Sequence, residues 1–315
     1  MADPALVQAV RGGDVDSVRA LVEGGEDVNE RCSDSGNTAL MFASNVGDAG
    51  IVRLLLAGGG NANQANNDGV TSLLLTSSRG HQEVAKLLLD GGADVDQANN
   101  NGATPLLISS QQGHQGVMTL LLAKSAKVDR ARSSGATALF MGSKNGHQEA
   151  VKLLLAKGAT VDQTSKSGAT PLLTSSRNGY QAIVKLLLKS GADVNHARSN
   201  GDTALSLAVH KGHTAVASLL RHWSLTISRR LTTYACVLRA IDLEEGRATQ
   251  GEPVTKLLQR LARTPDDIVR VIVMFVGDGG DAEEKLRLEK LARGEGAEYE
   301  RREGGKAIIG KSRTC

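Results

Sequence analysis

Aromatic residues are scarce in this chain. Phe, Trp and Tyr together make up 2% of the 315 residues, and there are only five prolines. Hydrophobic residues still account for 40% of the sequence, chiefly as Leu, Ala and Val, and there are 36 glycines. With so few rings to fill a core, small side chains favour helices that pack closely together. The length would allow two ordinary domains.

Cysteines and long apolar runs are also few. Cys32, Cys236 and Cys315 are odd in number and far apart, so they fit neither a disulfide framework nor a metal-ligand spacing. The N-terminus lacks a basic stretch followed by a long apolar one, and no segment approaches the roughly 20 apolar residues of a membrane helix. We therefore expect a soluble protein that does not engage a membrane. We expect it in the cytoplasm, with the nucleus as the alternative.

Two ladders of residues repeat with a period of 33 along most of the chain. In the first, a glycine is followed two residues later by a threonine, at Gly36, Gly69, Gly102, Gly135, Gly168 and Gly201. In the second, a glycine precedes the second apolar stretch of each unit, at Gly47, Gly80, Gly113, Gly146, Gly179 and Gly212. Between the ladders lie short apolar stretches of helical pattern, such as TPLLISSQQ and GVMTLLLAK. The sequence is therefore a tandem array of paired helices.

The pattern G-x-T-P-L…G-H…V-x-x-L-L-x-x-G-A resembles the ankyrin repeat family over residues 3–222. The resemblance implies an all-α solenoid of about seven repeats with β-hairpin tips, the first repeat being a degenerate cap. Leu87, Leu88 and Leu89 give one helix a wide apolar stripe that a single helix pair cannot bury, so stacked neighbours must cover it. The family also implies a scaffold or adaptor that binds a protein on its concave face. We expect no catalysis and no cofactor.

Several helix starts are readable from the sequence. Thr104 before Pro105, and Thr170 before Pro171, combine a hydroxyl that can cap a helix with a proline at the first helical position. Asp3 before Pro4 predicts a start of the same kind for the first helix.

The chain departs from the family pattern in two ways. The histidine that usually follows T-P-L is absent, its place being taken by Met41, Leu74, Leu107, Phe140, Leu173 and Ser206. The paired alanines of the first helix of each repeat are largely serines, at Ser77, Ser109, Ser110, Ser143, Ser175 and Ser176. We expect these hydroxyls to bond back to carbonyls of the preceding turn. The fold should survive both changes.

Two features that resemble chemical sites have structural interpretations. A second set of histidines follows the glycine ladder, at His81, His114, His147 and His213. Helices pack about 8–10 Å apart, whereas a zinc ion binds imidazole at about 2.0–2.1 Å, so neighbouring histidines cannot share an ion. Serine pairs such as Ser109 and Ser110 have no base at a meaningful spacing, so nucleophilic catalysis is unsupported. We expect no metal site.

The loop tips and helix ends change in character along the array. Early tips are rich in amides and later ones in cations, which predicts a protein-binding surface at Asn67, Asn100, Asn101, Arg130, Arg132, Lys144, Lys166, Arg177, Arg198 and Lys211. Only Asp202 opposes the seven cations of this set at the equivalent positions. A monomer that prefers a protein partner with an acidic surface is expected, although a merely solvated polar face is the alternative. Because the basic positions include no aromatic residue for base stacking and the net charge is only +3, we do not expect nucleic acid.

The 33-residue period stops after Trp223. Residues 223–265 read as an amphipathic helical extension that caps the stack, and 294–315 as a disordered tail. Between them, 266–293 combine an apolar segment with a charged helix, and 268–276 suit a strand or a helix. Residues 266–280 resemble the start of a Roco-type GTPase domain, but Glu283 stands where the phosphate loop needs lysine. The alternative function is therefore the regulatory arm of a longer ankyrin–GTPase protein.

Overall fold

The computed structural model describes residues 3–32 and 34–225. These residues form successive helix pairs: α1 (Ala5–Gly12) with α2 (Val15–Glu23), α3 (Ala39–Val46) with α4 (Ala49–Ala57), α5 (Ser72–Arg79) with α6 (Gln82–Asp90), α7 (Pro105–Gln112) with α8 (Gln115–Ala123), α9 (Ala138–Asn145) with α10 (Gln148–Ala156), α11 (Pro171–Arg177) with α12 (Gln181–Lys189), and α13 (Ala204–His210) with a helix that begins at 214. The stack lies in one compact unit, Met1–Trp223. The segments predicted for 226–315, including the GTPase-like stretch, lie outside the described residues.

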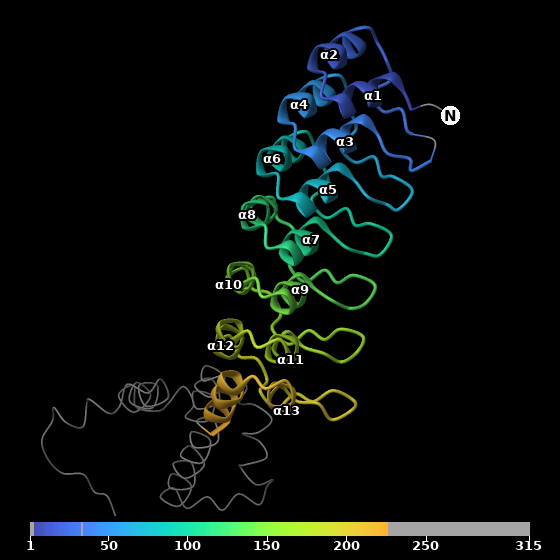
Figure 1. Cartoon of the computed structure of the whole chain (residues 1–315). Helices are drawn as coiled ribbons and strands as arrows, with labels where there is room; N and C mark the ends of the chain where they lie inside the picture. The colour runs from blue at the N-terminus through green and yellow to red at the C-terminus, as the bar shows by residue number, and fades with distance from the viewer. Residues whose placement is uncertain (1–2, 33, 226–315) are drawn as a thin grey trace, which may run out of the picture. The chain divides into compact units, whose positions relative to one another are not determined.

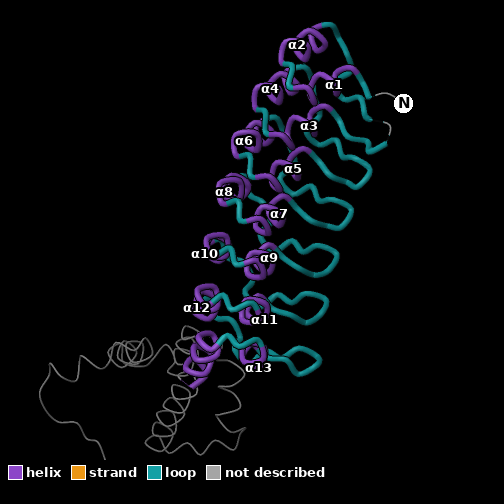
Figure 2. The backbone as a smooth tube through the Cα atoms, viewed as in Figure 1, coloured by secondary structure: helices purple, strands orange, loops and turns teal. Residues whose placement is uncertain are grey.

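The helices of the stack form two columns (Figure 1). The odd-numbered helices make an inner column and the even-numbered ones an outer column, and the loops between repeats project on the side away from the outer column (Figure 2). Each inner helix packs against the inner helices of the neighbouring repeats, as α7 does against α5 and α9. Each outer helix packs in the same way, as α8 does against α6 and α10. The predicted ankyrin solenoid is confirmed.

Threonine caps start the inner helices as predicted. Thr104 accepts a hydrogen bond from the backbone N–H of Leu107 at 3.3 Å, and Thr170 accepts one from that of Leu173 at 3.2 Å. Glycines then end several of these helices in the left-handed conformation, as Gly80 does at φ +83°. Such a residue closes a helix without the steric cost that a Cβ would bring. Several inner helices, such as α5 and α7, are thus bounded at both ends by their own sequence.

The prediction for the first helix was wrong by one residue. Pro4 occupies the N-cap position of α1, and no side-chain capping bond is present there. The carboxylate of Asp3 pairs instead with the guanidinium of Arg11, one helix length away. The guanidinium of Arg11 offers the Asp3 carboxylate a full positive charge, which the backbone N–H groups at the helix start do not carry.

The core of the stack is a column of leucines on the outer helices. Leu55, Leu88, Leu121, Leu154 and Leu187 repeat every 33 residues, and each is 0% exposed. Burial of such a side chain contributes about 1.5–3 kcal/mol relative to leaving it in water. The predicted stripe on α6 agrees with this column, since Leu88 and Leu89 are buried and Leu87 is half-buried. Neighbouring repeats therefore cover the apolar face that one helix pair leaves open.

A second buried column consists of serines on the inner helices, at Ser44, Ser77, Ser110, Ser143 and Ser176. The predicted back-bonding holds for the adjacent positions, where Ser109 and Ser175 each donate to a carbonyl three residues earlier at 3.1 Å. In the column itself the prediction was wrong. Ser110 donates to the next repeat, and the hydroxyls of Ser44, Ser77, Ser143 and Ser176 find no hydrogen-bond partner among the described residues. At Ser110 the hydroxyl reaches the neighbouring repeat rather than its own preceding turn.

The repeats are tied together by hydrogen bonds from the histidines that follow the second glycine ladder. The Nε2 atoms of His81, His114, His147 and His213 lie 2.9–3.2 Å from a backbone carbonyl 36 residues earlier. A carbonyl oxygen only accepts, so Nε2 carries the hydrogen in each ring. The tips are joined as well, since the backbone N–H of Asn67 donates to Ser35 and that of Lys166 donates to Ser134. These bonds fix the position of each of these tips relative to the one before it.

Candidate protein-binding surface

One face of each inner helix is left uncovered by the packing. It repeats as three columns at helix positions i, i+3 and i+4, which are neighbours on a helix surface. The first column is Phe42, Leu75, Ile108, Met141, Thr174 and Leu207; the second is Asn45, Ser78, Gln111, Lys144, Arg177 and His210; the third is Val46, Arg79, Gln112, Asn145, Asn178 and Lys211. All of these residues are half-buried or exposed except Met141, which is 4% exposed. We call these eighteen positions the inner face.

The chemistry of the inner face changes along the stack. In α3, α5 and α7 its second column holds neutral polar residues, and Val46 beside them is 71% exposed. From α9 onward the second column holds Lys144, Arg177 and His210. None of the eighteen positions carries a carboxylate. The inner face is therefore uncharged apart from Arg79 in its first half, and cationic in its second.

Four of the predicted cations are available to a partner. Lys144, Arg177 and Lys211 lie on the inner face, and Lys166 lies at the tip before α11; all four are exposed. Within residues 34–225, none of these side chains makes a hydrogen bond or an ion pair. An incoming carboxylate would not have to displace an existing partner from them.

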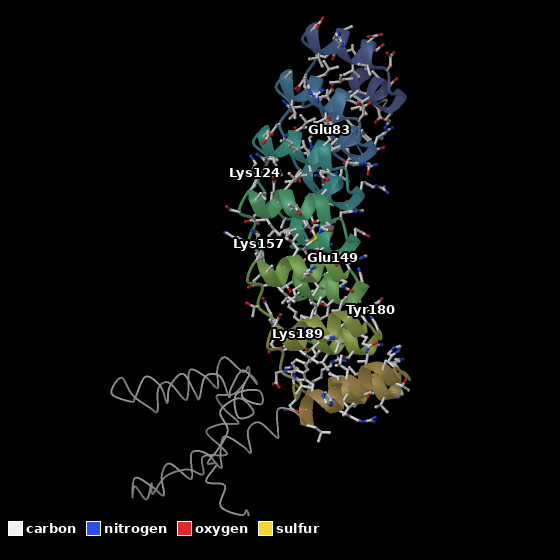
Figure 3. The ribbon with its side chains drawn as sticks, turned by 90° about the vertical axis from the view of Figure 1, so that its left-hand side faces the viewer. Glu83, Lys124, Glu149, Lys157, Tyr180 and Lys189 are labelled. Carbon is white, nitrogen blue, oxygen red and sulfur yellow. The ribbon has the colours of Figure 1, made fainter. Side chains whose placement is uncertain are left out.

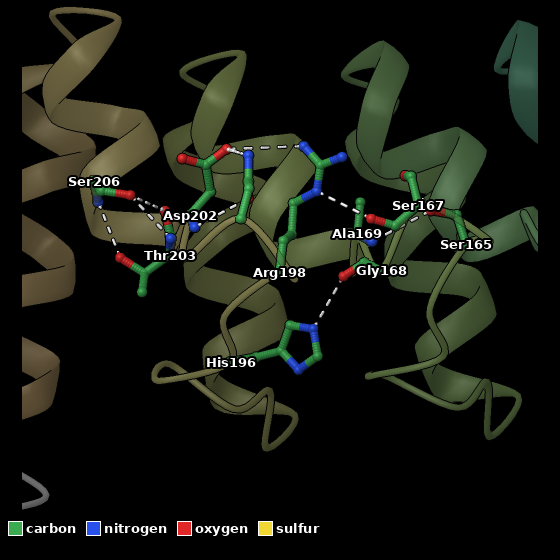
Figure 4. A network of polar contacts seen from close by, with 10 residues as sticks. Ser165, Ser167, Gly168, Ala169, His196, Arg198, Asp202, Thr203 and Ser206 are labelled. Atoms are coloured by element: carbon green, nitrogen blue, oxygen red, sulfur yellow. Dashed lines mark hydrogen bonds and ion pairs between the residues drawn. The ribbon is translucent and has the colours of Figure 1, made fainter.

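Three other predicted cations are already bonded. The guanidinium of Arg130 donates to the carbonyl of Asp96 at 2.8 Å, and that of Arg132 donates to the Ser134 hydroxyl at 2.8 Å. Arg198 donates to the carbonyl of Ser167 at 3.1 Å (Figure 4). Arg130 and Arg198 thereby join neighbouring repeats, so both help to hold the loops in place.

The opposing charge at Asp202 acts locally. Its carboxylate lies 3.9 Å from the Arg198 guanidinium and accepts a hydrogen bond from the Asn200 amide at 2.8 Å (Figure 4). In the same network, the His196 ring bonds to the carbonyl of Gly168 at 3.0 Å. The negative charge of Asp202 therefore offsets the positive charge of Arg198 at the last described tip, and none of the four available cations is paired with it.

The predicted asparagines serve the loops themselves. The Asn67 amide donates to the carbonyl of Asp34, and the Asn100 amide donates to that of Asn67, both at 3.1 Å. Asn101 is bonded through its backbone. Its N–H donates to the Asn99 side chain at 3.0 Å, and its carbonyl accepts a hydrogen bond from the Ser133 hydroxyl of the next tip. Contact of these asparagines with a partner stays a prediction.

Sequence reasoning overlooked the first half of the inner face. Arg79 belongs to the third column and donates to the Asn45 side chain at 3.1 Å. Phe42 and Val46 precede it on α3, and the ring of Phe42 lies 4.2 Å below the Arg11 guanidinium. Aligning the first helix of every repeat in columns would have found these residues, because their spacing from Gly47 and Gly80 is constant.

The outer helices present a different arrangement of charge (Figure 3). Here carboxylates accompany the cations: Lys124 lies 3.0 Å from Asp90, and Lys152 lies 3.8 Å from Glu149. Lys157 and Lys189 are exposed on this side (Figure 3). Exposed pairs of this kind contribute little to stability, about 0–1 kcal/mol. The outer side thus offers lysines from the same repeats as the inner face, which makes it a useful control surface.

Metal-binding clusters and cysteines are two kinds of group that often take part in chemistry. Residues 3–32 and 34–225 hold no group of three or more His, Cys, Asp or Glu side chains that could bind a metal ion. Burial raises the pKa of the Cys32 thiol, and Asp3 nearby raises it further. A raised pKa leaves less of the reactive thiolate. Among the described helices, none is long and apolar enough to span a bilayer.

Comparison with known proteins agrees with the geometry. The family described as "Ankyrin repeats (3 copies)" matches residues 6–99, 91–165 and 153–230. The chain belongs to the ankyrin repeat family. A solved structure of the human ASB11 ankyrin repeat domain is similar, with a TM-score of 0.62 and 26% identity, over 68% of this chain and 96% of that one.

Myotrophin of Xenopus tropicalis is 39% identical over 61 residues, which are 19% of this chain. The aligned stretch spans about half of that relative, 51% of its length. Ankyrin repeats generally mediate protein–protein interactions and are typically non-enzymatic.

Proposed function

We propose that this chain is a non-catalytic scaffold or adaptor that binds an acidic protein surface through the second half of its inner face. The observation that carries the proposal is a group of four exposed cations, Lys144, Lys166, Arg177 and Lys211, which have no partner among the described residues and lie on repeats whose inner face has no carboxylate. Cations on a rigid stack attract an acidic partner and select against a basic one.

The distribution of charge over the whole stack supports the same half. Residues 122–225 contain fourteen Lys and Arg against five Asp and Glu, whereas residues 3–121 contain six against fourteen. The long-range field therefore directs acidic surfaces to repeats five to seven. At physiological ionic strength this field decays over about 8 Å, so final binding depends on the local cations. We further propose that the protein acts as a monomer in the cytoplasm.

Charge reversal tests the proposal. Lys144, Lys166 and Arg177 are changed together to Glu, and the variant is compared with wild type in affinity capture from source cells with quantitative mass spectrometry. Because three attractive contacts become repulsive, we expect recovery of the main partner to fall about tenfold or more. Circular dichroism checks that the stack is still folded.

The matched control reverses Lys157, Lys185 and Lys189, which are exposed on the outer side of the same two repeats. Its net charge equals that of the first variant, so a general electrostatic effect would reduce recovery in both. Equal recovery of the partner with wild type and with the inner-face variant would contradict the proposal. An equal fall in both variants would also contradict it, because binding would then not depend on the inner face in particular.

A further inference from the structure

The inner face joins two surfaces of different chemistry. Its first half has apolar residues that stay partly open to solvent: Val46 is 71% exposed, and Phe42, Leu75 and Ile108 are half-buried. Its second half carries Lys144, Arg177 and Lys211. Both halves belong to the same columns of one continuous stack, so a ligand that lies along the inner helices meets both.

The exposure of Val46 is unusual for this molecule. Among the described residues, the large apolar side chains that are clearly exposed are Val15, Val46, Val209 and Leu225, and Val46 is the most exposed of the four. Its equivalents further along the stack are polar, at Arg79, Gln112, Asn145, Asn178 and Lys211. A valine this exposed, on a face that also holds the half-buried Phe42, Leu75 and Ile108, offers an apolar contact to a partner.

We infer that the occupant is a protein segment with two parts, an apolar cluster that lies on α3, α5 and α7 and a carboxylate cluster that lies on α9, α11 and α13. The inference rests on the proposed function and adds the chemistry of the partner. Charge complementarity selects this occupant, because the inner face carries four cations in its second and third columns, at Arg79, Lys144, Arg177 and Lys211, and no carboxylate. Apolar contact adds affinity that salt does not screen.

The stack also sets the spacing between the two parts. Val46 and Arg177 are four repeats apart, and helices pack about 8–10 Å apart, so these residues are separated by roughly 40 Å. An extended chain advances about 3.3 Å per residue, so about 12 residues cover the whole distance. An apolar residue on Ile108 and a carboxylate on Lys144 need only about three residues between them, since these repeats are adjacent.

The test uses a library of random peptides of about 16 residues, long enough for that distance, displayed on phage and selected on the full-length chain. We expect the enriched peptides to combine an apolar cluster with Asp or Glu within about 12 residues. Their affinity, measured by fluorescence anisotropy, should fall about tenfold in the variant with Lys144, Lys166 and Arg177 changed to Glu. Raising the salt concentration should weaken binding without abolishing it.

A second variant tests the apolar half. Val46→Thr keeps the side-chain shape, Ile108→Thr also shortens the side chain by one carbon, and both remove apolar surface; Val15→Thr on α2 is the matched control. We expect the double variant to lose about fivefold in peptide affinity and the control to lose none. Thermal melting of each variant separates lost binding from lost folding.

The outcomes distinguish the two ideas. Enriched peptides that are acidic only, and insensitive to the Val46 and Ile108 changes, would overturn the two-part inference and leave the proposed function intact. Peptides indifferent to the lysine and arginine reversal, or an absence of any enriched peptide, would overturn both. Displacement of an enriched peptide by single-stranded oligouridylate at equal concentration would also overturn the inference, because it would show a nucleic-acid surface.

Discussion

The hydroxyl of Ser110 donates a hydrogen bond of 2.7 Å to the backbone carbonyl of Ala138, which lies in the next repeat. Gly142 makes room for this bond, because a Cβ at that position would lie 2.8 Å from the Ser110 hydroxyl oxygen. The equivalent hydroxyls of Ser77, Ser143 and Ser176 are buried and have no hydrogen-bond partner within the part of the chain that the structure describes. One serine of the column therefore joins two repeats, and its equivalents carry an unmet hydrogen-bonding group.

This difference predicts opposite effects of one substitution. Ser143→Ala removes a buried, unpaired hydroxyl and should raise the free energy of unfolding by about 1 kcal/mol, whereas Ser110→Ala removes a made bond and should lower it by about the same amount. Urea denaturation followed by circular dichroism measures both. Destabilisation by Ser143→Ala would show that its hydroxyl has a partner in solution.

The histidine ladder depends on glycines beside it. A Cβ on Gly80 would lie 2.6 Å from Nδ1 of His114, whereas a Cβ on Gly92 would meet no atom within 4 Å. Both glycines have nearly the same backbone conformation, with φ of +83° and +87°. Alanine at either position is strained by about 1 kcal/mol, and only Gly80→Ala must also displace the ring.

We therefore expect Gly80→Ala to lower the midpoint of thermal unfolding clearly more than Gly92→Ala. The double variant with Gly80→Ala and His114→Ala should lose less stability than the sum of the losses in the two single variants. Without the His114 ring, the new Cβ at position 80 has no side chain to clash with. Equal effects of the two glycine changes would contradict the close approach of the His114 ring.

The first repeat has a titratable cap. Asp14 accepts bonds from the Ser17 hydroxyl and from the Ser17 backbone N–H, and these bonds hold the pKa of its carboxyl below the usual value. Because the pKa is lower in the folded state than in the unfolded state, the stabilisation is complete above the unfolded value of about 3.9. It is lost as the pH falls through the lower, folded-state pKa.

Asp14→Asn supplies the control, since asparagine also caps helices but does not titrate in this range. We expect the stability of wild type to fall relative to that of Asp14→Asn as the pH is lowered from about 5 to 2. Urea denaturation at a series of pH values gives the difference. Parallel curves for the two proteins would show that the Ser17 bonds do not favour the ionised form.

The sequence predicted the fold well because its signals are local and repeated. Thr104 and Thr170 cap their helices within three residues, and one period of 33 sets the stacking of every leucine in the outer column. Bonds between repeats were harder to predict. That Arg130 donates to Asp96, and that Ser110 donates to Ala138, depends on side-chain direction across an interface, which spacing along the chain does not specify.

The candidate site was predicted only in its charged half. Lys144, Arg177 and Lys211 stood out because charge is visible in a sequence, whereas Val46 stands out only when the first helices of all repeats are aligned and its column is seen to be polar elsewhere. Arg198 was grouped with the available cations because its bond to Ser167 and its pairing with Asp202 arise only once the last tip is folded.

Site-specific photo-crosslinking tests the central claim most directly, because it reports which side of the stack a partner contacts. Benzoylphenylalanine is placed at Arg177 on the inner face in one variant and at Lys185 on α12, on the outer side of the same repeat, in another; both positions are exposed. We predict that the main captured partner crosslinks to the variant at position 177 and not to the one at 185. Crosslinking at 185 alone would contradict binding through the inner face.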